Sequence, residues 1–457
     1  MRRLLNILLL TVLLVSCTLP GAKTKASFEV LTHPDGLLYA GDRVSFEVLA
    51  PPGFSIQNAS VQVHFKGKTL GSTGFISYGL GGRNEAILWW VWNTADLKPG
   101  AYTLTFTSQP DSVTWTETVR LHPAADVPPP EPEAHWATTT TVCCTISYIT
   151  GTAAERDLAT LGQEADQESA AVAAQMGTSL SQPINLIFMP RIIGHGGFTW
   201  DGVYVSYTDN SYIVSEMPIL FHHEFVHYYD AAVGGDYRPS MFEEGLAVYL
   251  SGGHFKPEPI EPRAAAMFDL GWYIPLEALT NDFYRQQHET GYLEAAALIQ
   301  YLVETYGLGA FNEFYRTIPK PENGQKDSDV IGLALQEHFG VSFADLETAY
   351  RLHLASLPVS ADVRTDLRLT VSYFDTVRRY QKTLDPSAYF LNPWLPDGSV
   401  MRQQGIVADF LRHPEGWRNR LIEPLLTRAG QERLRGDYSA TERTLKRINT
   451  ALDWLAP

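Results

Sequence analysis

The stretch His223-Glu224-Phe225-Val226-His227 carries the strongest local signal in the chain. On a helix, residues four apart share a face, so the two histidines present their imidazoles side by side. Two imidazoles placed in this way reach one zinc ion, with each nitrogen at about 2.0–2.1 Å from the metal. Glu224 lies about 100° further round the helix and still reaches a water on the metal, whose proton it can take. The stretch predicts a zinc-binding helix. The alternative is a helix with two histidines that bind no metal.

A hydrolytic zinc ion usually has three protein ligands, so a third ligand is expected near the two histidines. Asp230 shares their face about one turn further on, where it is better placed to orient a ligand histidine than to bind zinc. Ser240 and Glu243 have the spacing of a capping box at the start of the next helix. This structural role for Glu243 leaves Glu244 as the predicted third ligand, with Glu243 as the alternative.

The zinc helix and the residues that follow it resemble the gluzincin metallopeptidases. In that family a Glu-Gly-x-Ala on a second helix supplies the third ligand, and Glu244, Gly245 and Ala247 match it here. Sixteen residues separate His227 from Glu244. The resemblance covers about residues 140–357. It implies an α+β domain that hydrolyses peptide bonds with one zinc ion.

Tyr292 extends this resemblance. It precedes Tyr301 by nine residues, as does a tyrosine at the start of a helix in aminopeptidase-N-like gluzincins. There the hydroxyl stabilises the oxyanion of the tetrahedral intermediate, where negative charge develops during amide hydrolysis. The resemblance implies a catalytic role for Tyr292, and the alternative is an aromatic residue that packs a helix.

One feature of the aminopeptidases in this group is missing. They carry Gly-x-Met-Glu-Asn upstream of the zinc helix, and its Glu holds the substrate amine, but residues 194–199 contain no acid here. An endopeptidase is therefore favoured over an aminopeptidase. The strand expected at Val203–Tyr207 either pairs with an extended substrate or is an ordinary edge strand. His222 is expected to be packed or exposed, and His195 is a further candidate for the border of the cleft.

The N-terminal part of the chain has the period of β-strands. Alternating apolar residues separated by Gly and Pro turns fill residues 28–122 and predict six or seven strands in an antiparallel sandwich. Residues 97–104 resemble the penultimate hairpin of bacterial immunoglobulin-like modules, although the cysteines of antibody domains are absent. Five prolines within residues 123–136 predict a stiff linker after the sandwich.

The remainder is mixed and then helical. Residues 137–357 alternate between strand and helix before helices dominate, which suits the α+β class. Residues 358–457 are predicted to form a helical region, in which 436–440 resembles a tetratricopeptide turn without a repeat period. The predicted fold class is multidomain: an all-β immunoglobulin-like sandwich, an α+β gluzincin-type metallopeptidase domain and a helical C-terminal region.

The first residues predict export. Arg2 and Arg3 precede the apolar stretch Leu4–Val15, which is too short to cross a bilayer. This order is typical of a signal peptide, over residues 1–16. The alternatives are a plain signal without lipidation and an uncleaved anchor.

Leu14–Cys17 resembles a bacterial lipobox. The resemblance implies cleavage before Cys17, lipidation of that cysteine and a tether over residues 17–27. Thr18, in place of an aspartate, favours the outer membrane where one exists. The predicted location is therefore the bacterial cell envelope.

The composition of the chain limits the kinds of molecule that it is expected to bind. The net charge is -16 and no large basic cluster is present, which argues against binding to nucleic acid. Apolar residues make up 45%, enough for packed cores. Besides the lipobox cysteine, the chain has Cys143 and Cys144 in a predicted strand at Thr141–Tyr148. We expect two small core residues there, because neighbouring cysteines make a strained ring. A vicinal disulfide or a thiol metal site is the alternative.

Together these features predict a surface-anchored zinc peptidase with a peptide or protein substrate and an oligomeric state that the sequence leaves open. The predicted metal ligands are His223, His227 and Glu244, and the predicted catalytic residues are Glu224 and Tyr292. One alternative is another hydrolytic reaction at the same metal. The other is a noncatalytic surface-binding or scaffold lipoprotein with a degenerate peptidase domain.

Overall fold

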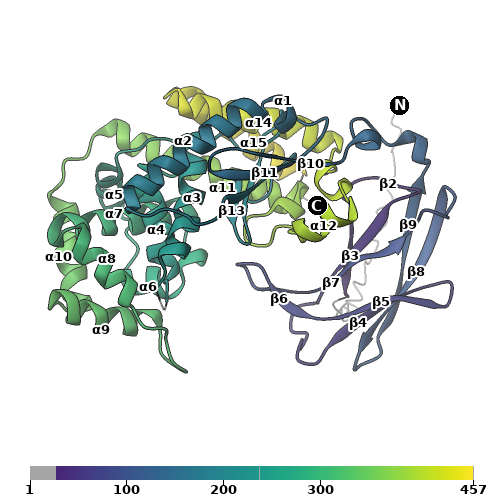
Figure 1. Ribbon diagram of the computed structural model, residues 1–457, viewed down its shortest axis with the longest axis horizontal. Helices are drawn as coiled ribbons and strands as arrows, with labels where there is room; N and C mark the ends of the chain where they lie inside the picture. The colour runs from purple at the N-terminus through teal and green to yellow at the C-terminus, as the bar shows by residue number, and fades with distance from the viewer. Residues whose placement is uncertain (1–26, 236, 456–457) are drawn as a thin grey trace, which may run out of the picture.

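Figure 1 shows the arrangement of the chain in a computed structural model, which describes residues 27–235 and 237–455. A β-sandwich of two sheets lies at one end and most helices lie at the other, with a separate mixed sheet between them. The mixed sheets, the many helices and the N-terminal β region agree with the predicted multidomain class at this coarse level. The predicted signal peptide and Cys17 lie outside the described residues.

Two sheets form the sandwich, with strand orders β1-β3-β7-β6 and β2-β9-β8-β4-β5. The strands are β1 (Glu29–His33), β2 (Leu38–Tyr39), β3 (Arg43–Leu49), β4 (Ser60–Phe65), β5 (Lys68–Gly74), β6 (Ile76–Tyr78), β7 (Arg83–Asn93), β8 (Gly100–Gln109) and β9 (Thr114–His122). The sequence pattern predicted six or seven strands, and it did not identify β2, β5 or β6. The sandwich is also not wholly antiparallel as predicted, because β2 runs parallel to β9.

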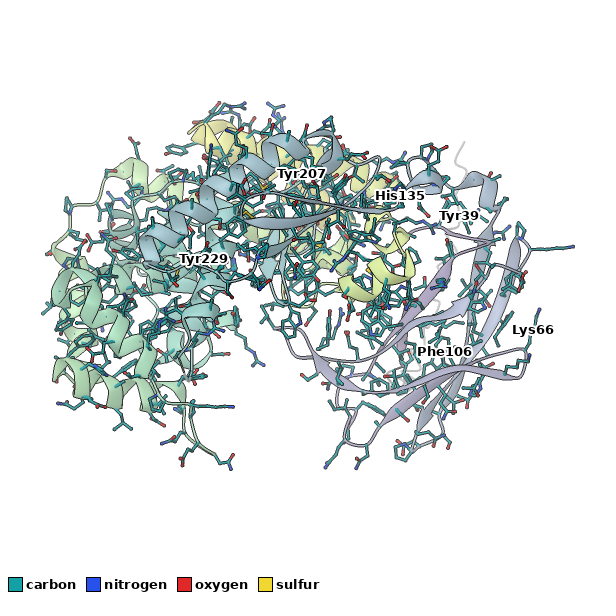
Figure 2. All side chains as sticks on the ribbon, in the orientation of Figure 1. Tyr39, Lys66, Phe106, His135, Tyr207 and Tyr229 are labelled. Atoms are coloured by element: carbon teal, nitrogen blue, oxygen red, sulfur yellow. A yellow bond between two sulfur atoms is a disulfide. The ribbon has the colours of Figure 1, made fainter. Side chains whose placement is uncertain are left out.

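The core of the sandwich follows from the period of two along its strands. In β4, Val61 and Val63 are fully buried while Gln62 between them is partly exposed. Phe46 and Phe106 come from different sheets and meet edge to face, with ring centroids 5.3 Å apart. Figure 2 shows Phe106 between the sheets and Lys66 on the outer rim. Burial of this apolar surface is the main stabilising term for such a module.

The mixed sheet has the order β10-β11-β12-β14-β13. Its strands are β10 (Trp136–Thr140), β11 (Cys144–Ile149), β12 (Ile184–Met189), β13 (Gly197–Thr199) and β14 (Val203–Ser206). The three inner strands are parallel and the two outer strands are antiparallel to their neighbours. The prediction that residues 203–207 form an edge strand was wrong, because β13 pairs along the outer side of β14 and itself forms the edge.

Helices make up most of the rest. They are α1 (Ala153–Arg156), α2 (Leu158–Met176), α3 (Met217–Val233), α4 (Ser240–Ser251), α5 (Ile260–Asp269), α6 (Leu276–Asn281), α7 (His288–Tyr306), α8 (Leu308–Thr317), α9 (Asp327–Phe339), α10 (Phe343–Ser356), α11 (Ala361–Leu384), α12 (Gly398–Gln404), α13 (Ala408–Leu411), α14 (Trp417–Leu434) and α15 (Tyr438–Leu455). Within residues 27–235 and 237–455, no helix combines the length and hydrophobicity that a bilayer crossing requires.

The C-terminal region packs onto the mixed part. Phe374 of α11 and Ile448 of α15 share one buried core with Tyr212 and Phe255. One face of the mixed sheet packs on α2 and α3, and residues 401–411 cover the other face. Both faces of the inner strands are therefore buried, which explains their nearly continuous apolar sequences. The predicted domain boundaries stay a prediction.

Arg412 joins this region to the sandwich. Its guanidinium donates to both carboxylate oxygens of Asp42, at 2.6 and 2.8 Å, and to Glu131 Oε2 at 2.7 Å. The Arg412 side chain is only 7% exposed. Nearby, the indole of Trp394 stacks on the His33 ring, with centroids 3.4 Å apart. The sandwich is thus held against the segment between α11 and α14 by buried ion pairs as well as by apolar contact.

Cys143 and Cys144 form a disulfide with each other, with an S–S distance of 1.98 Å. The expectation of two small core residues in a strand was wrong. In an extended strand, successive side chains point to opposite faces. Here the chain bends at residues 142–143 and β11 begins only at Cys144. Asp166 accepts the backbone N–H groups of Val142 and Cys143, at 3.3 and 2.8 Å, and so satisfies the bend.

Candidate metal centre

Helix α3 positions the two histidines through its opposite, apolar side. Phe221 and Phe225 are fully buried against the mixed sheet, with stacked rings 5.8 Å apart. Their burial fixes the rotation of α3. His223 and His227 then lie on a neighbouring stripe, again four residues apart, and face α4.

Helix α4 brings Glu244 to the histidines because Gly245 allows close packing on α7. A Cβ atom at Gly245 would lie 2.8 Å from the carbonyl carbon of Ala295. The glycine therefore serves the contact with α7. The predicted capping box is absent: Pro239 occupies the N-cap, and Glu243 instead accepts from Arg238 at 3.1 Å.

Three side chains converge at one point. The Nε2 atoms of His223 and His227 are 3.1 Å apart, and each lies 3.3 Å from Glu244 Oε2. Four ligands in a tetrahedron around zinc, at about 2.0–2.1 Å, have edges of roughly 3.3–3.4 Å. The two distances to Glu244 match such edges, and the distance between the two Nε2 atoms is about 0.2 Å shorter. The structure brings these three side chains together, and the set is one that a single zinc ion would fit.

The electrostatics of the three residues also suit a cation. Burial alone would raise the pKa of Glu244, but the charges of His227 and His223 hold it well below its ordinary value. Burial alone would lower the pKa of His227, but the carboxylate of Glu244 raises it to about 9. The carboxylate of Glu244 therefore favours positive charge at this position. A divalent cation could occupy the same negative potential.

Glu224 lies beside these three side chains and is held by the edge strand. The hydroxyl of Thr199, in β13, donates to Glu224 Oε2 at 2.9 Å, and the Glu224 side chain is almost wholly buried. A Cβ at Gly197 would lie 2.9 Å from Glu224 Oε1, so the glycine lets β13 approach α3. Burial raises the pKa of Glu224, while His223 and His227 and the Thr199 hydroxyl act in the opposite direction.

Two tyrosines border the cluster. Tyr284 donates its hydroxyl to Glu244 Oε1 at 2.9 Å, a contact that sequence reasoning missed because nothing in the local pattern marks Tyr284. Tyr292 lies in the second turn of α7, which begins at His288 and not at Tyr292 as predicted. Its ring is stacked 6.3 Å from the ring of His223. Burial and the nearby Glu244 carboxylate raise the pKa of Tyr292 well above its ordinary value, so its hydroxyl remains a donor.

Two other predictions concern polar residues of α3. Asp230 does not orient a ligand histidine. It accepts from Arg238 at 3.2 Å and from Tyr315 at 2.9 Å, and thereby ties α3 to α8. His222 is packed, as one of its two expected states, between Glu168 and Gln175 of α2. Within the described residues, the Nδ1 atoms of both predicted ligand histidines have no hydrogen-bond partner.

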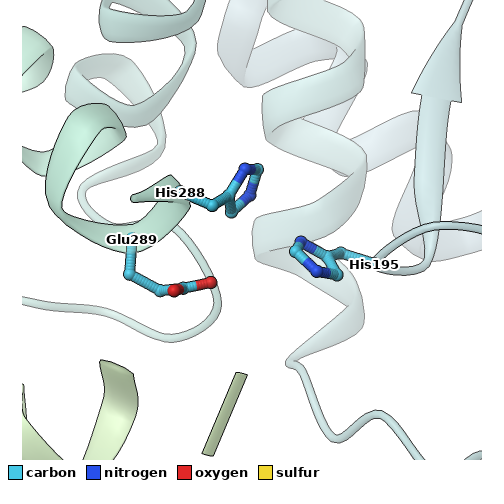
Figure 3. Close-up of side chains that lie close together, drawn as sticks. All are labelled: His195, His288 and Glu289. Atoms are coloured by element: carbon cyan, nitrogen blue, oxygen red, sulfur yellow. The ribbon is translucent and has the colours of Figure 1, made fainter. Parts of the chain in front are cut away.

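A second cluster lies near the first. Figure 3 shows the side chains of His195, His288 and Glu289 around a common space. Their nearest ligand-type atoms lie within 4.8 Å of one another, as do those of His223, His227 and Glu244. Both oxygens of Glu289 already accept from Arg378, at 2.8 and 2.7 Å. The fixed positive charge of Arg378 makes this cluster a poorer place for a divalent cation.

His254 connects the two clusters. Its ring stacks on Tyr292 at 4.5 Å and on His223 at 5.5 Å, and it lies 5.1 Å from the ring of His288. Sequence reasoning did not single out His254 or His288. The glycine pair before His254, at residues 252–253, was the only local signal that this residue follows a tight turn.

Comparisons with known proteins add little. No protein-family model matches the sequence, and no curated protein matches it significantly. A solved aminopeptidase N family protein from Idiomarina loihiensis is similar over 74% of this chain and 78% of its own, with 11% identity and a TM-score of 0.32. A likeness at this level carries no argument about the fold or the function of this chain.

Proposed function

We propose that this chain is a zinc-dependent peptidase of the gluzincin type. One observation carries the proposal: His223, His227 and Glu244 converge with distances of 3.1–3.3 Å, and Glu224 lies buried beside them. Three protein ligands and an open fourth position are typical of catalytic zinc, whereas structural zinc usually has four protein ligands.

The residues around the metal position divide the work of amide hydrolysis. Bound zinc would supply a Lewis acid that lowers the pKa of a coordinated water to about 7 and polarises the carbonyl. Glu224 takes a proton from the attacking water and then gives it to the leaving amine. Its burial raises its pKa and so makes it a stronger base. Tyr292 donates its hydroxyl proton in a hydrogen bond to the oxyanion.

We propose an endopeptidase rather than an aminopeptidase. Residues 194–199 provide no acid for a substrate amine. The edge strand β13 lies next to Glu224 and ends the mixed sheet among the described residues. An extended peptide can add to such an edge through backbone hydrogen bonds, which do not require a free terminus.

The same proposal includes export and lipid attachment at Cys17, with the immunoglobulin-like sandwich as a spacer. The lipobox resemblance of Leu14–Cys17 supports it. Cys17→Ala should move the protein from the membrane fraction to the soluble fraction of the cell envelope. Unchanged attachment would refute lipidation at this residue.

The alternative is a noncatalytic binding or scaffold protein. The complete set of His223, Glu224, His227, Glu244 and Tyr292 argues against it, because a degenerate site has no use for all five. Purified protein should contain about one zinc ion and should cleave members of a random peptide library. Glu224→Gln should keep the zinc and lose cleavage by a factor of about 10²–10⁴. Zinc binding without cleavage of any peptide or protein would favour the scaffold.

A further inference from the structure

A cleft of about 470 Å³ opens beside the metal centre. Three segments that are distant in sequence line it: residues 284–288 before and at the start of α7, residues 375–383 of α11, and residues 389–391. Its charged lining consists of Arg285, Arg378, Arg379, Lys382 and Asp375. Four cations and one anion give this cleft a positive lining in a chain whose net charge is -16.

The cleft is continuous with the metal centre. Tyr284 lines it and also donates to Glu244 Oε1 at 2.9 Å. His288 lines it as well, and its ring lies 4.1 Å from the ring of Tyr292. A chain bound at the metal can therefore continue into the cleft past these two side chains.

Not all of the four cations are available to a ligand. Arg378 is held by Glu289, and Arg379 by Asp453. Arg285 is different: its side chain is 66% exposed and its nearest carboxylate, that of Asp282, is 3.7 Å away.

Lys382 is the second available cation. Its ammonium lies 4.8 Å from the centre of the Tyr389 ring, and it takes part in no ion pair with the residues that the structure describes. Arg285 and Lys382 thus come from two walls of the cleft with hydrogen-bond donors to spare.

A buried group at the inner end also lacks a partner. His288 is 7% exposed, and its Nε2 atom makes no hydrogen bond to any described residue. A buried polar atom without a partner is costly, and a ligand that reaches it would remove that cost. The cleft thus offers two cations with hydrogen-bond donors to spare toward solvent and one unsatisfied polar atom toward the metal centre.

We propose that this cleft binds a carboxylate group of the peptide substrate, through Arg285 and Lys382, next to the bond that is cleaved. The inference rests on the proposed peptidase function and names its substrate class: peptides with a carboxylate on one side of the scissile bond, which for the proposed endopeptidase is that of an acidic residue. A free C-terminus as the ligand would instead make the enzyme act near the end of its substrate. Hydrogen bonds between ionised partners are about twice as strong as neutral ones, so the carboxylate governs selection.

A binding experiment separates this inference from the proposed function. The probes are fluorescent peptides of one sequence that differ in a single feature: Glu or Gln at each position in turn, and a free or amidated C-terminus. They are titrated into zinc-loaded Glu224→Gln protein, which cannot consume them. The Glu peptides reveal a side-chain carboxylate as the ligand, and the free-terminus peptides reveal the α-carboxylate.

One of these changes should strengthen binding roughly tenfold or more, and added salt should weaken that preference. Arg285→Gln and Lys382→Met should each remove most of it, while Lys326→Met, an exposed lysine outside the cleft, should leave it intact. Arg378 is kept, because its loss would leave the buried Glu289 unpaired.

Equal binding of acidic, neutral and amidated peptides overturns the inference, as does a preference that survives loss of both Arg285 and Lys382. If library peptides are cleaved without a preference for acidic residues, the proposed peptidase function stands and the proposed role of the cleft is wrong. If the protein binds acidic peptides selectively but cleaves no peptide, the proposed carboxylate site stands and the proposed peptidase function is wrong.

Discussion

At the scale of single residues, Tyr284 and Tyr292 both lie near the carboxylate of Glu244, but their loss should have different effects on zinc binding and on catalysis. Tyr284 hydrogen-bonds Glu244. Tyr284→Phe should therefore weaken zinc binding by roughly 10–100-fold, as for other partners of metal ligands. Tyr292→Phe should keep zinc affinity and lower kcat by about 10²–10³-fold, as for an oxyanion donor. Zinc titration with a competing chelator and steady-state kinetics measure the two effects. Identical profiles for the two variants would contradict the assigned roles.

Thr199 provides a pH test. Its hydroxyl donates to Glu224, which stabilises the carboxylate and lowers its pKa. In Thr199→Val that hydrogen bond is lost, so the pKa of Glu224 rises and the base is protonated over a wider acidic range. The acidic limb of kcat/KM should move to higher pH, with zinc content unchanged. A limb that stays in place, or moves to lower pH, would show that Thr199 does not act on Glu224.

The sequence predicts that the three candidate ligands converge because their arrangement is local. The spacing of His223 and His227 is a property of any helix, and Glu244 follows from one short connection. Thr199, Tyr284 and His254 reach the site only through tertiary packing, which no spacing encodes. Asp230 shows the converse. Its helical position was predicted correctly, but arginines from other segments decide its partners.

At the scale of elements, the contact between α4 and α7 sets the position of Glu244. Gly245→Ala should lower the free energy of unfolding by about 1–3 kcal/mol, since a methyl group would collide with the backbone at Ala295. Thermal or chemical unfolding of the metal-free protein measures this. Gly309→Ala in α8 is the matched control, because an added Cβ there meets nothing within 4 Å. An equal loss in both variants would show that helix crowding is not the cause.

The edge of the mixed sheet shows where element prediction failed. β13 has three residues and begins at Gly197, so it carries too little alternation to be recognised as a strand. β14 was recognised as a strand, but it was expected at the edge of the sheet, whereas it lies between β12 and β13. Strand order depends on pairing between distant segments, and a period of two identifies a strand without identifying its neighbours.

At the scale of the whole molecule, Arg412 should hold the sandwich in place. Removing it leaves Asp42 and Glu131 as buried charges without their partner. Arg412→Ala should therefore destabilise the contact by about 3–5 kcal/mol. Small-angle scattering should show a more extended molecule, and proteolysis should become faster at residues 123–136. Arg420→Ala, an exposed arginine 3.5 Å from Glu415, should change neither measurement.

The sequence could not predict this contact. Residues 386–416 contain only short helical turns, and their importance arises from partners far away in the sequence. Asp42 lies 370 positions before Arg412, and Glu131 lies 281 positions before it. The prolines of 123–136 were interpreted as a separator, whereas Glu131 within them binds Arg412. A high proline content predicts a stiff segment, but it does not show whether that segment makes tertiary contacts.

The clamp at Arg412 has a geometric consequence for the proposed anchored enzyme. A flexible stalk would let the catalytic part sample every tilt above the lipid. A sandwich that buried ion pairs fix to the catalytic part instead holds that part in one orientation relative to itself. The mouth of the cleft would then keep one direction relative to the sandwich, and the predicted tether over residues 17–27 would join this rigid unit to the lipid. Its access to proteins that stand in the same membrane would differ from its access to freely diffusing ones.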